Sequence, residues 1–196
     1  MSDEVSTVFV GDSITAGGRW DDWFPEEHSR NLGVAGDTTD AVLARLDDII
    51  ALDPDTVVLL IGTNDLAWRR SAEHIVRNIE TILVSLRKAL PTAQLLVQSV
   101  MPREAAYADT IKDVNRHLWQ FSSTVRAQYL DLWPALAADD DGIDPQYSDD
   151  SVHLNEHGYE VWAGELRAAL ETLHKVPPTS RPILIPREHL KHRRQA

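Results

Sequence analysis

Short runs of β-branched and other apolar residues alternate along this chain with longer segments in which apolar residues recur every three or four positions. The first pattern is typical of buried β-strands, and the second of helices that pack one face against a core. Because parallel neighbouring strands need right-handed crossover connections, the alternation predicts an α/β fold with a doubly wound parallel sheet. The expected strands are Thr7–Val10, Asn31–Val34, Thr56–Ile61, Gln94–Val100 and Arg126–Leu130, and the expected helices are Asp40–Leu52, Ser71–Leu90, Asp109–Thr124 and Asn155–Leu173.

Length sets the number of domains. A chain of 196 residues, 43% of them hydrophobic, can bury one substantial core and is short for two. We therefore expect one domain over residues 1–175. The remaining segment, 176–196, contains four prolines and ends in basic residues, so we expect an extended arm. Its apolar stretch 183–185 predicts packing on the domain or across a homodimer interface, the alternative being a frayed terminus.

The charge and the residues that are missing exclude several classes of partner. The formal net charge of -12 opposes binding to nucleic acid or to anionic lipid. The chain has no cysteine, which excludes disulfides and a cysteine nucleophile. No apolar run approaches the roughly 20 residues of a membrane span, and no cationic leader precedes the first strand. We expect a cytoplasmic protein with neither a nucleic-acid nor a membrane partner.

Four polar motifs follow predicted strands or precede the last helix. Ser13 lies in "GDSIT" after the first strand, Gly36 in "GVAGDTT" after the second, and Asn64 in "GTND" after the third. Each motif taken alone is typical of an ordinary turn or helix cap. The fourth, "DSVH", places Asp150 three residues before His153, so that the carboxylate can orient the imidazole. Because loops at the carboxyl ends of parallel strands share one edge of the sheet, we expect these residues to converge.

Together these residues can carry out acyl transfer. His153 would take the proton of the Ser13 hydroxyl and later protonate the leaving alkoxide, while Asp150 orients the imidazole. The backbone amides of Ser13 and Gly36 and the side-chain amide of Asn64 would stabilise the oxyanion. The reaction needs no cofactor and no metal.

The four motifs, in this order and over most of the chain, resemble those of the SGNH, or GDSL-type, hydrolases. The resemblance is greatest to the branch that includes platelet-activating-factor acetylhydrolase subunits and carbohydrate acetylesterases. It implies a three-layer α/β/α sandwich with a five-stranded, flavodoxin-like sheet. It also implies Ser13, Asp150 and His153 as catalytic residues, with Gly36 and Asn64 as oxyanion donors.

The sequence constrains the substrate less than it constrains the fold and the catalytic residues. No long amphipathic segment offers a lipid-docking surface, so we expect short-chain esters, acetyl esters above all, of a small or carbohydrate-like alcohol. A lipase, lysophospholipase or thioesterase acting on longer acyl chains is the alternative. The candidate pocket residues are Asp12, Trp20, Trp23, Trp68, Met101 and Arg103. Packing of the aromatic residues beneath the sheet edge is an equal alternative for each of them.

Two remote alternatives compete with a serine esterase. The segment "HLNEH" matches a zinc-binding pattern through His153 and His157, although that pattern leaves Ser13, Gly36 and Asn64 unexplained. An inactive binding module is the non-enzymatic alternative, because fold does not determine function. No group that the esterase reaction needs is missing.

Overall fold

The computed structural model describes residues 6–175, and a five-stranded sheet forms its centre. All neighbouring strands are parallel, in the order β2-β1-β3-β4-β5. This order confirms the predicted doubly wound sheet. The strands are β1 (Thr7–Gly11), β2 (Ser29–Gly33), β3 (Thr56–Leu60), β4 (Gln94–Gln98) and β5 (Ala127–Leu130).

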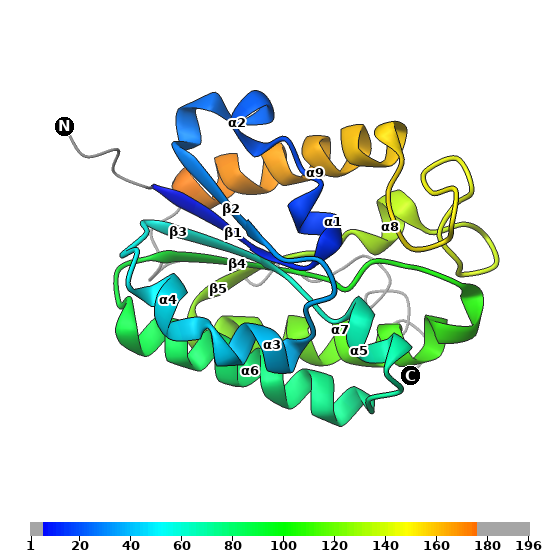
Figure 1. Cartoon of the computed structure of the whole chain (residues 1–196), viewed down its shortest axis with the longest axis horizontal. Helices are drawn as coiled ribbons and strands as arrows, with labels where there is room; N and C mark the ends of the chain where they lie inside the picture. The colour runs from blue at the N-terminus through cyan, green and yellow to red at the C-terminus, as the bar shows by residue number, and fades with distance from the viewer. Residues whose placement is uncertain (1–5, 176–196) are drawn as a thin grey trace, which may run out of the picture.

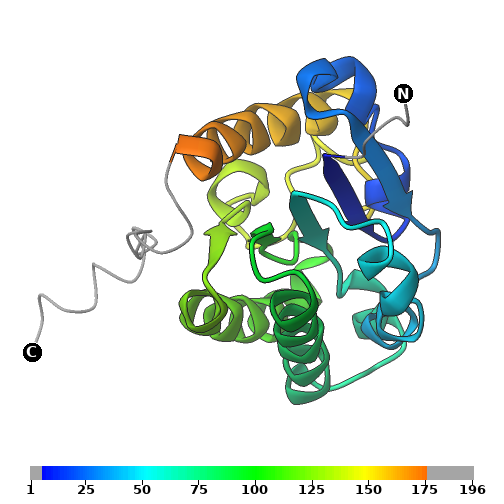
Figure 2. The ribbon, with the colours of Figure 1, turned by 90° about the vertical axis from the view of Figure 1, so that its left-hand side faces the viewer.

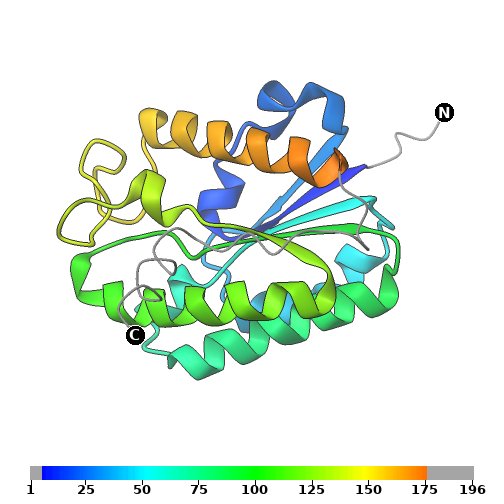
Figure 3. The same ribbon diagram turned by 180° about the vertical axis from the view of Figure 1, so that it is seen from behind.

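Helices cover both faces of the sheet, which gives the three layers of the expected sandwich (Figure 1). One face carries α1 (Ser13–Ala16), α2 (Trp20–Trp23), α8 (Trp133–Leu136) and α9 (Glu156–Lys175). The other carries α3 (Thr39–Ala44), α4 (Leu46–Ile50), α5 (Thr63–Ala67), α6 (Ala72–Ala89) and α7 (Ala108–Ser122). Three short 3-10 turns complete the described elements: η1 (Pro25–Glu27), η2 (Ala105–Tyr107) and η3 (Ser123–Val125). Figures 2 and 3 show the same layers from the side and from behind.

Two hydrophobic cores lie on the opposite faces of the sheet. Successive side chains of a strand point to opposite faces, so each buried strand contributes to both cores. In β1, Val8 and Val10 enter one core, whereas Phe9 between them enters the other. This burial on both faces explains why the strands are continuous apolar runs without polar alternation.

The predicted helix Asp40–Leu52 is wrong as a single element. The structure divides it into α3 and α4 at Arg45, whose backbone leaves the helical conformation with φ -110° and ψ 14°. The Arg45 amide bonds three residues back to Val42, and its side chain turns toward the ends of β1 and β2. The regular spacing of Val42, Leu46 and Ile49 hides this break, because all three still face one core.

The other predicted elements are present with shifts of a few residues at their ends. The prediction omitted the short helices α1, α2, α5 and α8, which are too short to show a helical period. None of the helices within residues 6–175 is both long and apolar enough to cross a membrane. The arm predicted for residues 176–196, and with it the proposed homodimer contact, lies outside the described residues.

Candidate active site

Ser13, His153 and Asp150 form one hydrogen-bonded chain at the carboxyl edge of the sheet. Ser13 Oγ lies 3.0 Å from Nε2 of His153, although 140 positions separate the two residues in the sequence. Nδ1 of His153 lies 2.7 Å from Oδ2 of Asp150. With its proton on Nδ1 the imidazole donates to the carboxylate, which leaves Nε2 to accept the serine proton.

The loop that carries Asp150 and His153 is organised by the carboxylate itself. Oδ1 of Asp150 accepts the backbone amides of Val152, at 2.9 Å, and of His153, at 2.7 Å. The bond from the His153 side chain, together with these two backbone bonds, holds the pKa of Asp150 well below its usual range. The carboxylate is therefore ionised wherever the imidazole needs a partner.

A sharp strand-to-helix turn presents Ser13. Ser13 lies two residues after Gly11, the last residue of β1, and is the first residue of α1. A Cβ atom at Gly11 would lie 2.1 Å from Oγ1 of Thr15 and 2.3 Å from the carbonyl oxygen of Leu60. Only glycine fits this position, so the turn can bring the serine to the edge of the sheet.

The two remaining sequence candidates lie on adjacent loops. Gly36 has φ +83°, a conformation that favours glycine, in the turn after β2. Nδ2 of Asn64 donates to the carbonyl oxygen of Asp37 at 2.9 Å, so the amide of Asn64 lies against the residue that follows Gly36. The second hydrogen of that Nδ2 is available for another acceptor. Within residues 6–175 the backbone amides of Ser13 and Gly36 donate to no protein acceptor.

A buried carboxylate joins these two loops, and the sequence analysis did not identify it. Asp65 is fully buried, and its two oxygens accept from the backbone amide of Thr39 at 2.9 Å and from the Thr39 hydroxyl at 2.6 Å. Asn64 and Asp65 thus attach the loop after β3 to the loop after β2 at two successive points. Its signal in the sequence is the acidic residue of "GTND", which directly follows Asn64.

The six candidate pocket residues do not form one pocket. Trp20 is buried and stacks on Phe9 with ring centroids 4.2 Å apart, so it belongs to the core. Met101 is also buried in that core. The ring of Trp23 packs 5.7 Å from that of Tyr159. Trp68 is 71% exposed, so it is not a buried pocket wall.

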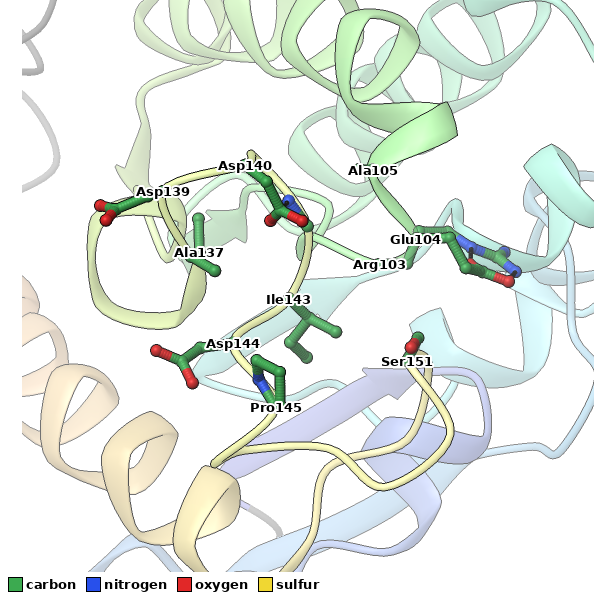
Figure 4. A pocket seen from close by; sticks show the side chains of 12 residues that line it. Arg103, Glu104, Ala105, Ala137, Asp139, Asp140, Ile143, Asp144, Pro145 and Ser151 are labelled. Atoms are coloured by element: carbon green, nitrogen blue, oxygen red, sulfur yellow. Dashed lines mark hydrogen bonds and ion pairs between the residues drawn. The ribbon is translucent and has the colours of Figure 1, made fainter.

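Arg103 lines a cavity of about 620 Å³ between the segment after β4 and the loop that joins α8 to α9 (Figure 4). The cavity reaches Ser151, which immediately follows Asp150. In Figure 4 the carboxylate of Asp140 points toward the space between the two segments, whereas those of Asp139 and Asp144 point away from Arg103 and Ser151. The charged lining residues are Arg103, Glu104, Asp139, Asp140 and Asp144. Arg103 is occupied by Glu104, with Nε 2.6 Å from Oε2, so the cavity is acidic overall.

Asp12 is a buried capping residue and does not line the cavity. Its side chain is 1% exposed, and Oδ1 accepts the backbone amide of Ile14 at 2.9 Å, at the start of α1. Burial raises the pKa of Asp12 to about 6, and the bond from Ile14 opposes part of this shift.

The raised pKa of Asp12 makes the stability of the protein depend on pH. Between the unfolded pKa near 3.8 and the folded pKa of about 6, the folded state binds more protons, so stability falls as pH rises. An asparagine still accepts the Ile14 amide and carries no charge. We expect Asp12→Asn to gain stability relative to the parent between pH 4 and pH 7, by about 1–3 kcal/mol. Denaturant unfolding at each pH measures this gain, with exposed Asp48→Asn as the control for loss of one charge. A gain that is the same at every pH would contradict the assignment.

The zinc alternative does not fit the arrangement of its own residues. Both ring nitrogens of His153 are engaged, one with Ser13 and the other with Asp150. The ring of His157 packs edge-on against Tyr147, with centroids 5.1 Å apart. In the part of the chain that the structure describes, the close grouping of metal-type ligands is a different one, formed by Asp40, Asp65 and His74.

A serine, a histidine and an aspartate joined in this order at the edge of a parallel α/β sheet define the class of serine hydrolases. Residues 9–161 match the model of the GDSL-like lipase/acylhydrolase family, and the chain belongs to that family. The protein is therefore a GDSL-type hydrolase.

A similar relative and two solved structures of similar fold are known. The chain is similar to the platelet-activating factor acetylhydrolase IB subunit alpha1 of Rattus norvegicus, with 29% identity over 167 residues, covering 80% of this chain and 71% of that protein. Its fold is similar to that of a GDSL-like lipase from Bacteroides thetaiotaomicron, with a TM-score of 0.77 and 24% identity over 88% of this chain and 90% of that one. It is also similar to that of an acetyl-xylooligosaccharide esterase from Geobacillus Stearmophilus, with a TM-score of 0.68 and 19% identity over 84% of this chain and 95% of that one.

Proposed function

We propose that this protein is a serine esterase that hydrolyses short-chain esters, acetyl esters above all, of a small or carbohydrate-like alcohol. The observation that carries the proposal is the chain of contacts from Ser13 Oγ through the imidazole of His153 to Asp150. A serine hydroxyl is a weak nucleophile unless a base removes its proton, and here a base lies within hydrogen-bonding distance.

The reaction proceeds through an acyl-enzyme. Ser13 Oγ attacks the ester carbonyl carbon while its proton passes to Nε2 of His153, and the carbonyl oxygen becomes an oxyanion. The amides of Ser13 and Gly36 and the side chain of Asn64 donate to that oxyanion. Collapse of the intermediate breaks the bond to the alcohol oxygen, which takes the proton from His153. A water molecule then repeats the sequence on the acyl-enzyme and releases the carboxylic acid.

The acidic cavity beside Asp150 supports a polar, uncharged alcohol. Carboxylates only accept hydrogen bonds when ionised, so Asp140, whose carboxylate points into this space, suits a hydroxyl group of a sugar-like molecule. The acidic residues of the cavity repel phosphate groups. Two of the similar proteins, an acetylhydrolase and an acetyl-xylooligosaccharide esterase, are named for reactions at acetyl groups, which supports the short acyl chain.

The acyl-chain preference tests this proposal. We expect kcat/KM for p-nitrophenyl esters to be highest between acetate and butyrate and to fall steeply toward decanoate. A panel of acetylated sugars then identifies the alcohol.

A maximum at octanoate or longer would contradict the short-chain proposal and favour a lipase or thioesterase. Under that alternative, two exposed apolar side chains could contact a long acyl chain. They are Val34, 45% exposed, and Trp68, 71% exposed, which lie on the loops of Gly36 and Asn64. Trp68→Ala is the matched variant. It should leave the acetate rate unchanged under the short-chain proposal, and it should selectively slow long esters under the alternative.

A further inference from the structure

The side chain of Arg45 joins three segments that meet behind the candidate active site. Its Nε donates to Oδ2 of Asp37 at 2.8 Å. Its Nη2 donates to the carbonyl oxygen of Leu32 at 2.8 Å and to that of Gly11 at 3.3 Å. The side chains of Arg45 and Asp37 are 23% and 12% exposed, so water weakens this ion pair less than one on the surface. A single guanidinium therefore holds the ends of β1 and β2 and the turn that follows β2.

Two of these three acceptors lie close in the sequence to a residue of the proposed mechanism. Gly11 precedes Ser13 by two positions, and Asp37 immediately follows Gly36. The backbone carbonyl of Asp37 also accepts from the side chain of Asn64. Arg45 thus touches the supports of the nucleophile and of the oxyanion donors but contacts none of these groups directly.

We propose that Arg45 is a positioning residue that sets the distance between Ser13 and the oxyanion donors Gly36 and Asn64. The inference rests on the proposed esterase mechanism and adds a residue to it. The guanidinium is planar and holds its donors in a fixed fork, so it can keep several acceptors at set positions. The break between α3 and α4 falls at this residue, which is where the side chain leaves the helix to reach the strand ends.

Loss of the fork should affect the transition state more than substrate binding. Oxyanion donors act on charge that develops only during the reaction, so a shift in their position lowers kcat. A misplacement of about 1 Å can cost on the order of 100-fold in rate. The KM of a small ester should change little, because Arg45 does not touch substrate.

Arg87 provides a matched control. It too binds several backbone carbonyls through one guanidinium, at the end of α6: those of Val125 at 2.9 Å, Ala93 at 2.8 Å and Pro91 at 3.0 Å. These carbonyls precede β4 and β5, so they lie at the amino edge of the sheet, opposite the candidate site. Replacing Arg87 removes the same kind of structural support without touching the oxyanion loops.

The experiment compares Arg45→Lys and Arg45→Met with Arg87→Lys and Arg87→Met. For each variant, kcat and KM are measured with p-nitrophenyl acetate, thermal unfolding reports stability, and a trifluoromethyl ketone reports affinity for a tetrahedral adduct. We expect both Arg45 variants to lose about 10- to 100-fold in kcat with KM nearly unchanged, and to bind the ketone more weakly by a similar factor. Arg45→Lys should recover stability relative to Arg45→Met but should not recover kcat. Lysine keeps the positive charge but lacks the planar set of guanidinium donors. The Arg87 variants should lose stability only.

Two results would overturn the inference. One is equal kcat in the Arg45 and Arg87 variants at comparable loss of stability, and the other is full recovery of kcat by Arg45→Lys. If Arg45→Met does not fold, Arg45→Lys decides between these outcomes. Failure of the esterase mechanism itself is recognised separately, because the parent protein would then not form a covalent adduct at Ser13.

Discussion

Replacing Ser13 with alanine should lower kcat by at least about 10⁴-fold while leaving the fold intact. In the proposed mechanism this hydroxyl forms the acyl-enzyme, and no second serine lies at Nε2 of His153 within the described residues. The oxyanion donors survive the substitution, so a small residual rate remains. Steady-state hydrolysis of p-nitrophenyl acetate measures the loss, and the burst of p-nitrophenol should disappear as well.

Ser71→Ala is the matched control, because Ser71 is a true helix cap. Its side chain accepts the backbone amide of His74 at the start of α6. Its removal should cost about 1 kcal/mol of stability and leave turnover unchanged, the reverse of the result expected at Ser13. If Ser13→Ala instead behaves like Ser71→Ala, Ser13 is only a residue that begins a helix.

Replacing His153 with alanine should be nearly as damaging as replacing Ser13, because the serine is not activated without its base. The two residues act as one unit, so the double variant should lose little more than either single variant. Their kcat values, measured on the same ester, test this non-additivity. His157→Ala should be nearly silent, since that ring packs against Tyr147 and is not part of the hydrogen-bonded chain. Multiplicative losses in the double variant would show that the residues act independently.

Much of the fold could be predicted because a strand that is buried on both faces is a continuous run of apolar residues in the sequence. The run "TVVLL" of β3 is buried throughout and could be recognised without any partner. Very short helices show no comparable apolar pattern in the sequence. Helices α1 and α5 are four and five residues long, and their hydrogen bonds depend on the turns that the sheet imposes on them. Likewise, the apolar spacing around Arg45 looks continuous, since periodicity reports which face is buried and not whether the backbone is broken.

The convergence of Ser13, Asn64 and His153 follows from sheet topology, so it too was accessible from sequence. The surroundings of the site were not. Trp20 follows the nucleophile closely in sequence, yet it turns into the core against Phe9, because its position depends on side-chain packing across layers. Arg45 and Asp65 were missed for a related reason. Each acts on loops that are distant in sequence, so its partners cannot be read from its neighbours, even though Asp65 stands within "GTND".

Covalent labelling tests most directly whether the side chain of Ser13 is the nucleophile. The protein is incubated with an organophosphonate ester, and mass spectrometry of its peptides locates the adduct. We expect one adduct, on Ser13, that forms as activity is lost and that is absent from Ser13→Ala. Complete inactivation with the label on a different residue, or full activity in a sample whose Ser13 is labelled, would show that Ser13 is not the nucleophile.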